Sequence, residues 1–199
     1  MNYQNVTFMT SAAKSDQCPD DIGSEVAFAG RSNSGKSSAL NTLTKHKALA
    51  RVSKTPGRTQ LINFFALEPE ENRLVDLPGY GYAKVPVAVR KSWQSMLEMY
   101  LSKRESLKGI ILLVDSRHPL KEFDLVMIQY ALDLNTPIHL LLTKSDKLSN
   151  NQQAKTIMLV KKELQNKYQS DLCTVQLFSS LKNNGVDLLV SQLDNWFEK

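Results

Sequence analysis

The sequence predicts an α/β protein of three layers, in which helices cover both faces of a mixed, mostly parallel six-stranded sheet. Short apolar, β-branched runs alternate with segments whose apolar residues recur at helical spacing, the pattern of β-α-β units in a parallel sheet. One connection, EPEENR, is too short and acidic for a parallel crossover. It predicts a hairpin, and therefore one antiparallel edge strand.

The expected elements follow one another in this alternation. The apolar runs EVAFAG, LINFFAL, RLVDLP, GIILLVDS, PIHLLLT and CTVQLFSS predict strands over residues 25–30, 61–67, 73–78, 109–116, 137–143 and 173–180. Helices are expected over residues 36–44, 87–105, 121–134, 151–168 and 186–198, where residues such as Leu125, Ile128 and Leu132 share one helical face. No linker or repeat divides the chain, so residues 1–199 are expected to form one domain, with residues 1–22 as an N-terminal extension.

Composition is that of an ordinary globular protein, with 42% hydrophobic and 23% charged residues in 199. No apolar run has the length of a membrane span, and neither a secretion signal nor a lipidation cysteine is recognisable, so a cytoplasmic protein is expected. Two cysteines and three histidines lack zinc-ligand spacing. The net charge of +5 is local, because no acidic residue lies between Glu25 and Glu68.

A phosphate-binding loop is predicted by GRSNSGKS, which matches G-x-x-x-x-G-K-S/T between a strand and a helix. Its backbone N–H groups can surround a phosphate, Lys36 can reach the terminal phosphates, and the Ser37 hydroxyl can bind Mg²⁺. The expected contacts are Gly30, Arg31, Ser32, Asn33, Ser34, Gly35, Lys36, Ser37 and Ser38.

A second motif, DLPG, ends the third expected strand with Asp76, Leu77, Pro78 and Gly79. Asp76 can hold magnesium through water, and the Gly79 N–H can meet a γ-phosphate. Alone, this short motif is common in unrelated sequences.

Two further motifs predict recognition of guanine. TKSD, residues Thr143, Lys144, Ser145 and Asp146, ends the fifth expected strand. The Asp146 carboxylate can accept from both N1–H and the amine of guanine, and the Lys144 stem can cover the ring. Phe178, Ser179 and Ser180 end the last strand, where a backbone N–H can meet the guanine carbonyl. Because the carboxyl ends of parallel strands share one edge, all four motifs are expected to converge.

The chain resembles the EngB family of bacterial ribosome-assembly GTPases, which have a P-loop GTPase fold, through FAGRSNSGKSSALN, TPGRTQ, DLPGYGYAKV, TKSDKL and FSSLKNNG. The resemblance implies binding of GTP and GDP and a role in assembly of the large ribosomal subunit and in cell division. It adds Gly57, Arg58, Thr59, Gln60 and Leu61 to the site. It also implies Ser37, Thr59 and Asp76 as the magnesium set, and Lys36, Thr59 and Asn33 as catalytic residues.

Hydrolysis is expected to be slow, because Tyr80 follows the D-x-x-G glycine where other GTPases place a glutamine that orients water. Asn33 leaves two interpretations open. It stands where related GTPases hold a monovalent cation, so it can bind K⁺, or it only tolerates the tight loop backbone.

A phosphate-binding loop is also compatible with two other functions. An ATP-using P-loop kinase is disfavoured by Asp146, and a Ras-like signalling switch is disfavoured by the basic loop and the missing lipidation motif. Two segments are expected to respond to the γ-phosphate, the loop around Thr59 and the DLPG motif, and basic residues flank both. These residues are Arg51, Lys54, Arg58, Lys84, Arg90 and Lys91. A solvated face would explain these charges, but their position together with the family resemblance favours contact with ribosomal RNA. The protein is expected to be a monomer.

Overall fold

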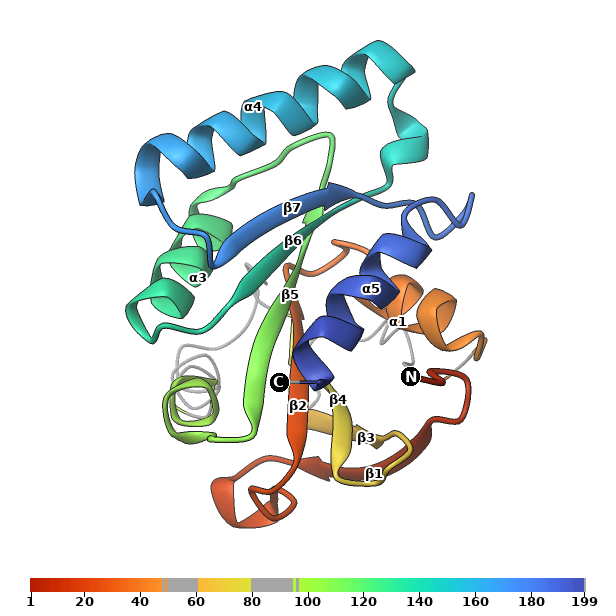
Figure 1. The fold of residues 1–199 in the computed structure, drawn as a ribbon, viewed down its shortest axis with the longest axis vertical. Helices are drawn as coiled ribbons and strands as arrows, with labels where there is room; N and C mark the ends of the chain where they lie inside the picture. Colours follow the sequence, from red (N-terminus) through yellow and green to blue (C-terminus); the bar gives the residue numbers. More distant parts are fainter. Residues whose placement is uncertain (48, 50–60, 80–94, 96, 199) are drawn as a thin grey trace.

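The described residues form one mixed sheet of seven strands (Figure 1). They come from a computed structural model, which describes residues 1–47, 49, 61–79, 95 and 97–198. The strands are β1 (Thr7–Ala12), β2 (Ser24–Gly30), β3 (Ile62–Ala66), β4 (Asn72–Asp76), β5 (Leu107–Asp115), β6 (Ile138–Thr143) and β7 (Cys173–Leu177). Their order is β1-β3-β4-β2-β5-β6-β7. From β4 to β7 all neighbours are parallel, whereas β3 is antiparallel to both β1 and β4.

The predicted fold class is confirmed, including the β3–β4 hairpin, but the predicted number of strands is wrong by one. The antiparallel strand β3 therefore lies between β1 and β4 and not at the edge of the sheet. Residues 7–12, expected to belong to an N-terminal extension, form β1 at the edge of the sheet beside β3. The first three residues of β1 are exposed. Because a half-exposed edge strand needs no continuous apolar run, the sequence carried no strong strand signal there.

Helices cover both faces of the sheet, as predicted. They are α1 (Lys36–Thr44), α3 (Glu122–Asp133), α4 (Asn150–Tyr168) and α5 (Val186–Phe197), with short 3₁₀ turns η1 (Ser15–Gln17) and η2 (Ser145–Lys147). Most of the helix expected over residues 87–105 lies outside the described residues, although residues 97–103 are helical. In the described part of the chain, no helix is both long and apolar enough to span a bilayer.

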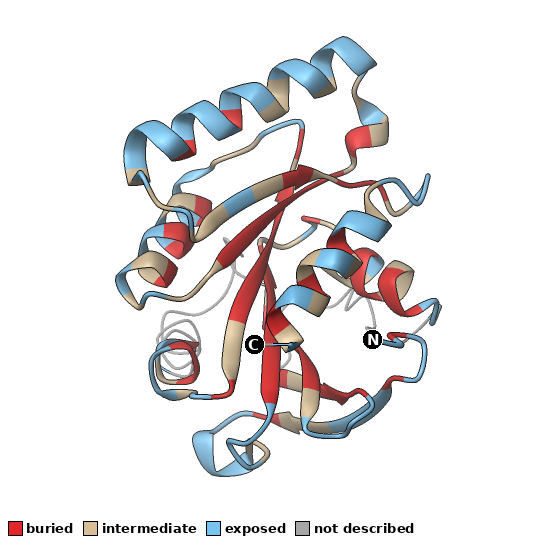
Figure 2. Ribbon diagram, in the orientation of Figure 1, coloured by how far each residue is buried: buried red, intermediate tan, exposed pale blue. Residues whose placement is uncertain are grey.

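Two apolar cores lie on opposite faces of the sheet, and β5 contributes to both. Leu112 and Val114 join the core under α3 and α4, while Ile111 and Leu113 join the core under α1 and α5. Successive strand residues point to opposite faces, and both faces are covered, so β5 reads as an unbroken apolar run. Figure 2 shows this burial along the central strands, in contrast to the exposed outer side of α4.

A buried charge cluster holds the amino ends of the central strands. Glu25, which is fully buried at the start of β2, accepts from Arg73 of β4 at 3.0 Å. Arg104 donates to both oxygens of Glu25, at 2.7 and 3.0 Å, and the Tyr100 hydroxyl donates at 2.8 Å. Burial, together with this carboxylate, raises the pKa of Tyr100 well above its ordinary value. The cluster joins β2, β4 and helical residues 97–103 at the end of the sheet opposite Gly30.

A buried histidine of β6 has a hydrogen-bond partner on β7 for each ring nitrogen. His139 lies with Nε2 3.0 Å from Gln176 Oε1 and Nδ1 2.7 Å from Thr174 Oγ1. The amide oxygen accepts from Nε2–H, and the Thr174 hydroxyl can either donate to Nδ1 or accept from it, so burial is what disfavours the charged ring. Burial lowers the pKa of His139 to about 4.

This histidine predicts a loss of stability in mild acid. As the pH falls, His139 becomes protonated near its ordinary pKa of 6.5 in the unfolded chain, but only near pH 4 in the folded chain. The contribution of His139 to the free energy of unfolding is therefore complete above about pH 6.5 and falls as the pH drops to about 4. The expected loss between pH 7 and 5 is about 2 kcal/mol. Urea unfolding of the wild type and of His139→Gln at both pH values measures it. The same pH dependence in both proteins would show that His139 is not the cause.

Candidate functional site

The four predicted motifs meet at one edge of the sheet. Gly30, Asp76 and Thr143 are the last residues of β2, β4 and β6, and Phe178 directly follows β7. These strands are parallel, so their carboxyl ends lie on the same side. This edge is where open α/β sheets bind ligands.

The phosphate-binding loop has the backbone of a strand-to-helix turn. Gly35 precedes α1 with φ of 94°, and Asn33 has φ of 65°. Both values lie in the left-handed region, which glycine and asparagine adopt more readily than other residues. Lys36, Ser37 and Ser38 form the first turn of α1, whose free N–H groups favour an anion.

DLPG lies directly against this loop. The Lys36 ammonium pairs with the Asp76 carboxylate, and both side chains are largely buried. A Cβ placed on Gly79 would lie 3.6 Å from Ser32 N, so the backbones of the two motifs run side by side. Leu77 and Pro78 are buried, and the Leu77 N–H donates to Phe28 O of β2 at 3.0 Å.

The residues predicted to recognise guanine are hydrogen-bonded to one another. Ser179 Oγ donates to Asp146 Oδ1 at 2.6 Å, and Ser145 N donates to Phe178 O at 3.1 Å. The Asp146 side chain is therefore oriented before any ligand arrives. Phe178 is fully buried in the core under α5, so only its backbone faces the site, while Ser180 is half-buried.

The base-recognition motif also touches the phosphate-binding loop. Thr143 Oγ1 donates to Ser34 O at 2.5 Å, and Lys144 Nζ donates to Asn33 O at 2.6 Å. Motifs more than a hundred residues apart in the sequence thus form a single site.

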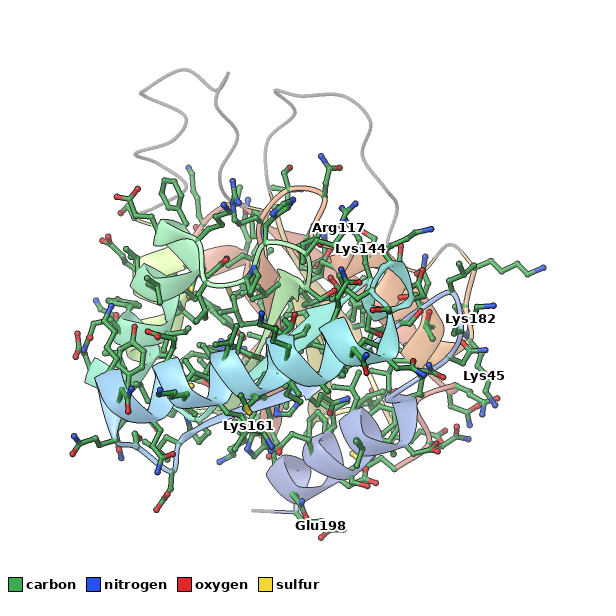
Figure 3. All side chains as sticks on the ribbon, turned by 90° about the horizontal axis from the view of Figure 1, so that it is seen from above. Lys45, Arg117, Lys144, Lys161, Lys182 and Glu198 are labelled. Carbon is green, nitrogen blue, oxygen red and sulfur yellow. The ribbon has the colours of Figure 1, made fainter. Side chains whose placement is uncertain are left out.

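Asp115 is a residue of this site that the sequence reasoning missed. It ends β5, and its Oδ2 accepts from Lys144 Nζ at 2.9 Å. Arg117 donates to the same carboxylate through Nε at 2.9 Å and a terminal nitrogen at 2.7 Å. Hydrogen bonds from Arg117 and Lys144 hold the pKa of Asp115 well below its ordinary value. Its place at the end of an apolar strand was the signal available. Figure 3 shows Arg117 beside Lys144 at this edge.

Some predicted site residues cannot be placed. Gly57, Arg58, Thr59, Gln60 and Tyr80 lie outside the described residues. Leu61 directly precedes β3. The expected roles of Thr59 and Tyr80 therefore remain predictions.

The residues present suit magnesium better than a metal held by protein alone. Among the residues that the structure describes, no three His, Cys, Asp or Glu side chains gather as metal ligands. Asp76 and Ser37 instead offer one carboxylate and one hydroxyl beside the phosphate-binding loop. Mg²⁺ commonly takes few protein oxygens and completes its shell with water and phosphate.

Comparison with known proteins identifies the family. The sequence model described as "50S ribosome-binding GTPase" matches residues 25–144. The probable GTP-binding protein EngB of Francisella philomiragia is 56% identical over 198 residues, covering 100% of both chains. The chain belongs to the EngB family. Its counterpart from Francisella tularensis subsp. novicida is 55% identical with the same coverage.

A solved structure of an EngB protein has the same fold. That crystal structure of a probable GTP-binding protein engB superposes with a TM-score of 0.68, covering 88% of this chain and 99% of its own, at 22% identity. The resemblance read from the motifs is thereby confirmed, and with it the assignment to a family of GTPases.

Proposed function

We propose that this EngB protein is a GTP-dependent switch that binds the large ribosomal subunit in one nucleotide state and leaves it in the other. The observation that carries the nucleotide part is the Asp146 carboxylate, oriented by Ser179 and joined through Thr143 and Lys144 to the phosphate-binding loop. The description "50S ribosome-binding GTPase" supports the ribosomal part.

The phosphate end of the site requires one rearrangement. Lys36 and Asp76 satisfy each other's charge across the loop, so this pair opens when Lys36 turns to the nucleotide phosphates. Asp76, Ser37 and Thr59 would hold Mg²⁺, which supplies positive charge to the β- and γ-phosphates. The Gly79 N–H is proposed to meet the γ-phosphate.

Hydrolysis is proposed to be slow without a partner. Tyr80 follows Gly79 and carries no amide to orient the attacking water. Asn33 lies exposed in the loop with positive φ, which fits both of its interpretations, a K⁺ ligand or a residue that only accommodates the turn. Slow hydrolysis would keep the GTP state long enough for the switch to act.

The proposed ribosomal contact uses the basic residues that flank the loop around Thr59 and the DLPG motif. Arg51, Lys54 and Arg58 precede or adjoin Thr59, and they lie outside the described residues. Cations beside segments that respond to a γ-phosphate can make RNA phosphate contacts depend on GTP. We place this monomeric protein in the cytoplasm, acting in assembly of the large subunit and thereby in cell growth and division.

Sedimentation with purified large subunits tests this function. We expect at least about tenfold more protein to pellet with a non-hydrolysable GTP analogue than with GDP, and binding to weaken steeply from about 50 to 200 mM salt as RNA counterions are released. Lys54→Glu with Arg58→Glu should flatten the salt dependence. The matched double reversal Lys161→Glu with Lys162→Glu, on exposed positions of α4, should not. Equal binding in both nucleotide states would refute the switch.

A further inference from the structure

We propose that Asp115 is a positioning residue for nucleotide binding, which acts by holding Lys144 over the base site. The inference rests on the proposed function, because it concerns how that site is prepared for guanine nucleotide. It comes from a contact that lies outside the predicted motifs: the carboxylate of Asp115, at the end of β5, accepts a hydrogen bond from Lys144, which directly follows β6.

Lys144 is held at both ends. Its backbone adopts φ of 57° directly after Thr143, and its ammonium donates to Asn33 O and Asp115 Oδ2 at 2.6 and 2.9 Å. A lysine side chain has several rotatable bonds, so two fixed partners remove most of its freedom before ligand binds. The apolar stem is then already laid out between the base-recognition motif and the phosphate-binding loop.

Asp115 is itself fixed independently of Lys144. Its Oδ1 accepts from Arg117 N at 3.1 Å, and its two oxygens accept from the Arg117 guanidinium. The order of support is therefore Arg117 to Asp115, and Asp115 to Lys144. Two cations share one carboxylate, which leaves one net positive charge beside a site proposed for an anionic ligand.

The burial of these groups separates positioning from general stability. The Asp115 side chain is 20% exposed, and the Arg117 side chain is 45% exposed. Removing Asp115 therefore leaves no fully buried charge without a partner, and the free energy of unfolding should change little. A change in nucleotide affinity without a matching change in unfolding is the expected signature.

A double-mutant cycle on Asp115 and Lys144 tests the proposal, with fluorescent GDP as the probe. We expect Asp115→Ala to weaken GDP binding about tenfold, mainly through faster release, the scale of one lost charge-assisted hydrogen bond. In a Lys144→Ala background, the same change should cost less than about twofold, because its target is gone. Arg117→Ala removes the other cation from the same carboxylate and is expected to cost less than about threefold.

Three outcomes would overturn the proposed role of Asp115. Equal weakening by Asp115→Ala in both backgrounds would overturn the proposal, since Asp115 would then act without Lys144. An unchanged GDP affinity in Asp115→Ala would also overturn it, as would a fall in affinity fully explained by unfolding of the variant. Failure of the wild type to bind GDP would instead refute the proposed function.

Discussion

Asp146→Asn is expected to weaken GDP binding by ~10³-fold or more and to create binding of xanthosine diphosphate. Guanine offers two donors, N1–H and its amine, to the two carboxylate oxygens. An asparagine keeps one acceptor but turns the other position into a donor, which suits the carbonyl that xanthine carries in place of the amine. Ser179 Oγ donates to Asp146 Oδ1 at 2.6 Å. In the variant, the asparagine carbonyl oxygen can accept the same hydrogen bond, which leaves the amide nitrogen as the donor toward the base.

Titration of both proteins with both nucleotides measures this exchange. Asp187→Asn, the same chemical change at an exposed position in the first turn of α5, is the matched control and should keep the wild-type preference. An Asp146→Asn protein that still prefers GDP over the xanthosine nucleotide would contradict the assignment of Asp146 to the base.

Glu25→Ala is expected to destabilise the fold by about 3–5 kcal/mol, the cost of leaving buried cations without their partner. Glu25 is fully buried, and Arg73 and Arg104 are 4% and 10% exposed. The variant would leave two guanidinium groups and the Tyr100 hydroxyl without their shared acceptor. Because Glu25 lies at the opposite end of β2 from Gly30, the variant should retain its preference for guanine where it is folded.

Urea unfolding at neutral pH measures the free energy lost. Glu163→Ala, at an exposed glutamate of α4, should stay within about 0.5 kcal/mol of the wild type. A loss below about 1 kcal/mol in Glu25→Ala would mean that the cluster contributes little, and that the strand ends are held by the apolar cores alone.

The sequence predicted most of the framework because its strands are covered on both faces. Strands such as β5 and β6 appear as unbroken apolar runs, and α1 begins at Lys36 as the loop motif requires. β1 escaped because it is an edge strand with exposed side chains. The spacing of apolar residues along the sequence shows which side chains are buried, so a strand that is exposed at one edge and on one face gives little signal.

The site was predictable where chemistry is encoded in consecutive residues, and not where it depends on register. GRSNSGKS and TKSD each carry a spacing tied to a ligand. Asp115 fell within the strand expected over residues 109–116 and was given no role, because its partner Lys144 follows 29 positions later. Glu25 was read simply as the start of a strand. Both acquire their roles only when the parallel register of β2 with β4, and of β5 with β6, brings distant residues together.

The preference of the wild-type protein for guanine tests the central claim most directly. Calorimetric titration with GDP and with ADP, each with Mg²⁺, should give one site that binds GDP at least ~10³-fold more tightly, because adenine presents the opposite donors and acceptors to Asp146. GDP and ADP binding with affinities within about tenfold of each other would contradict the guanine site on which the proposed switch depends.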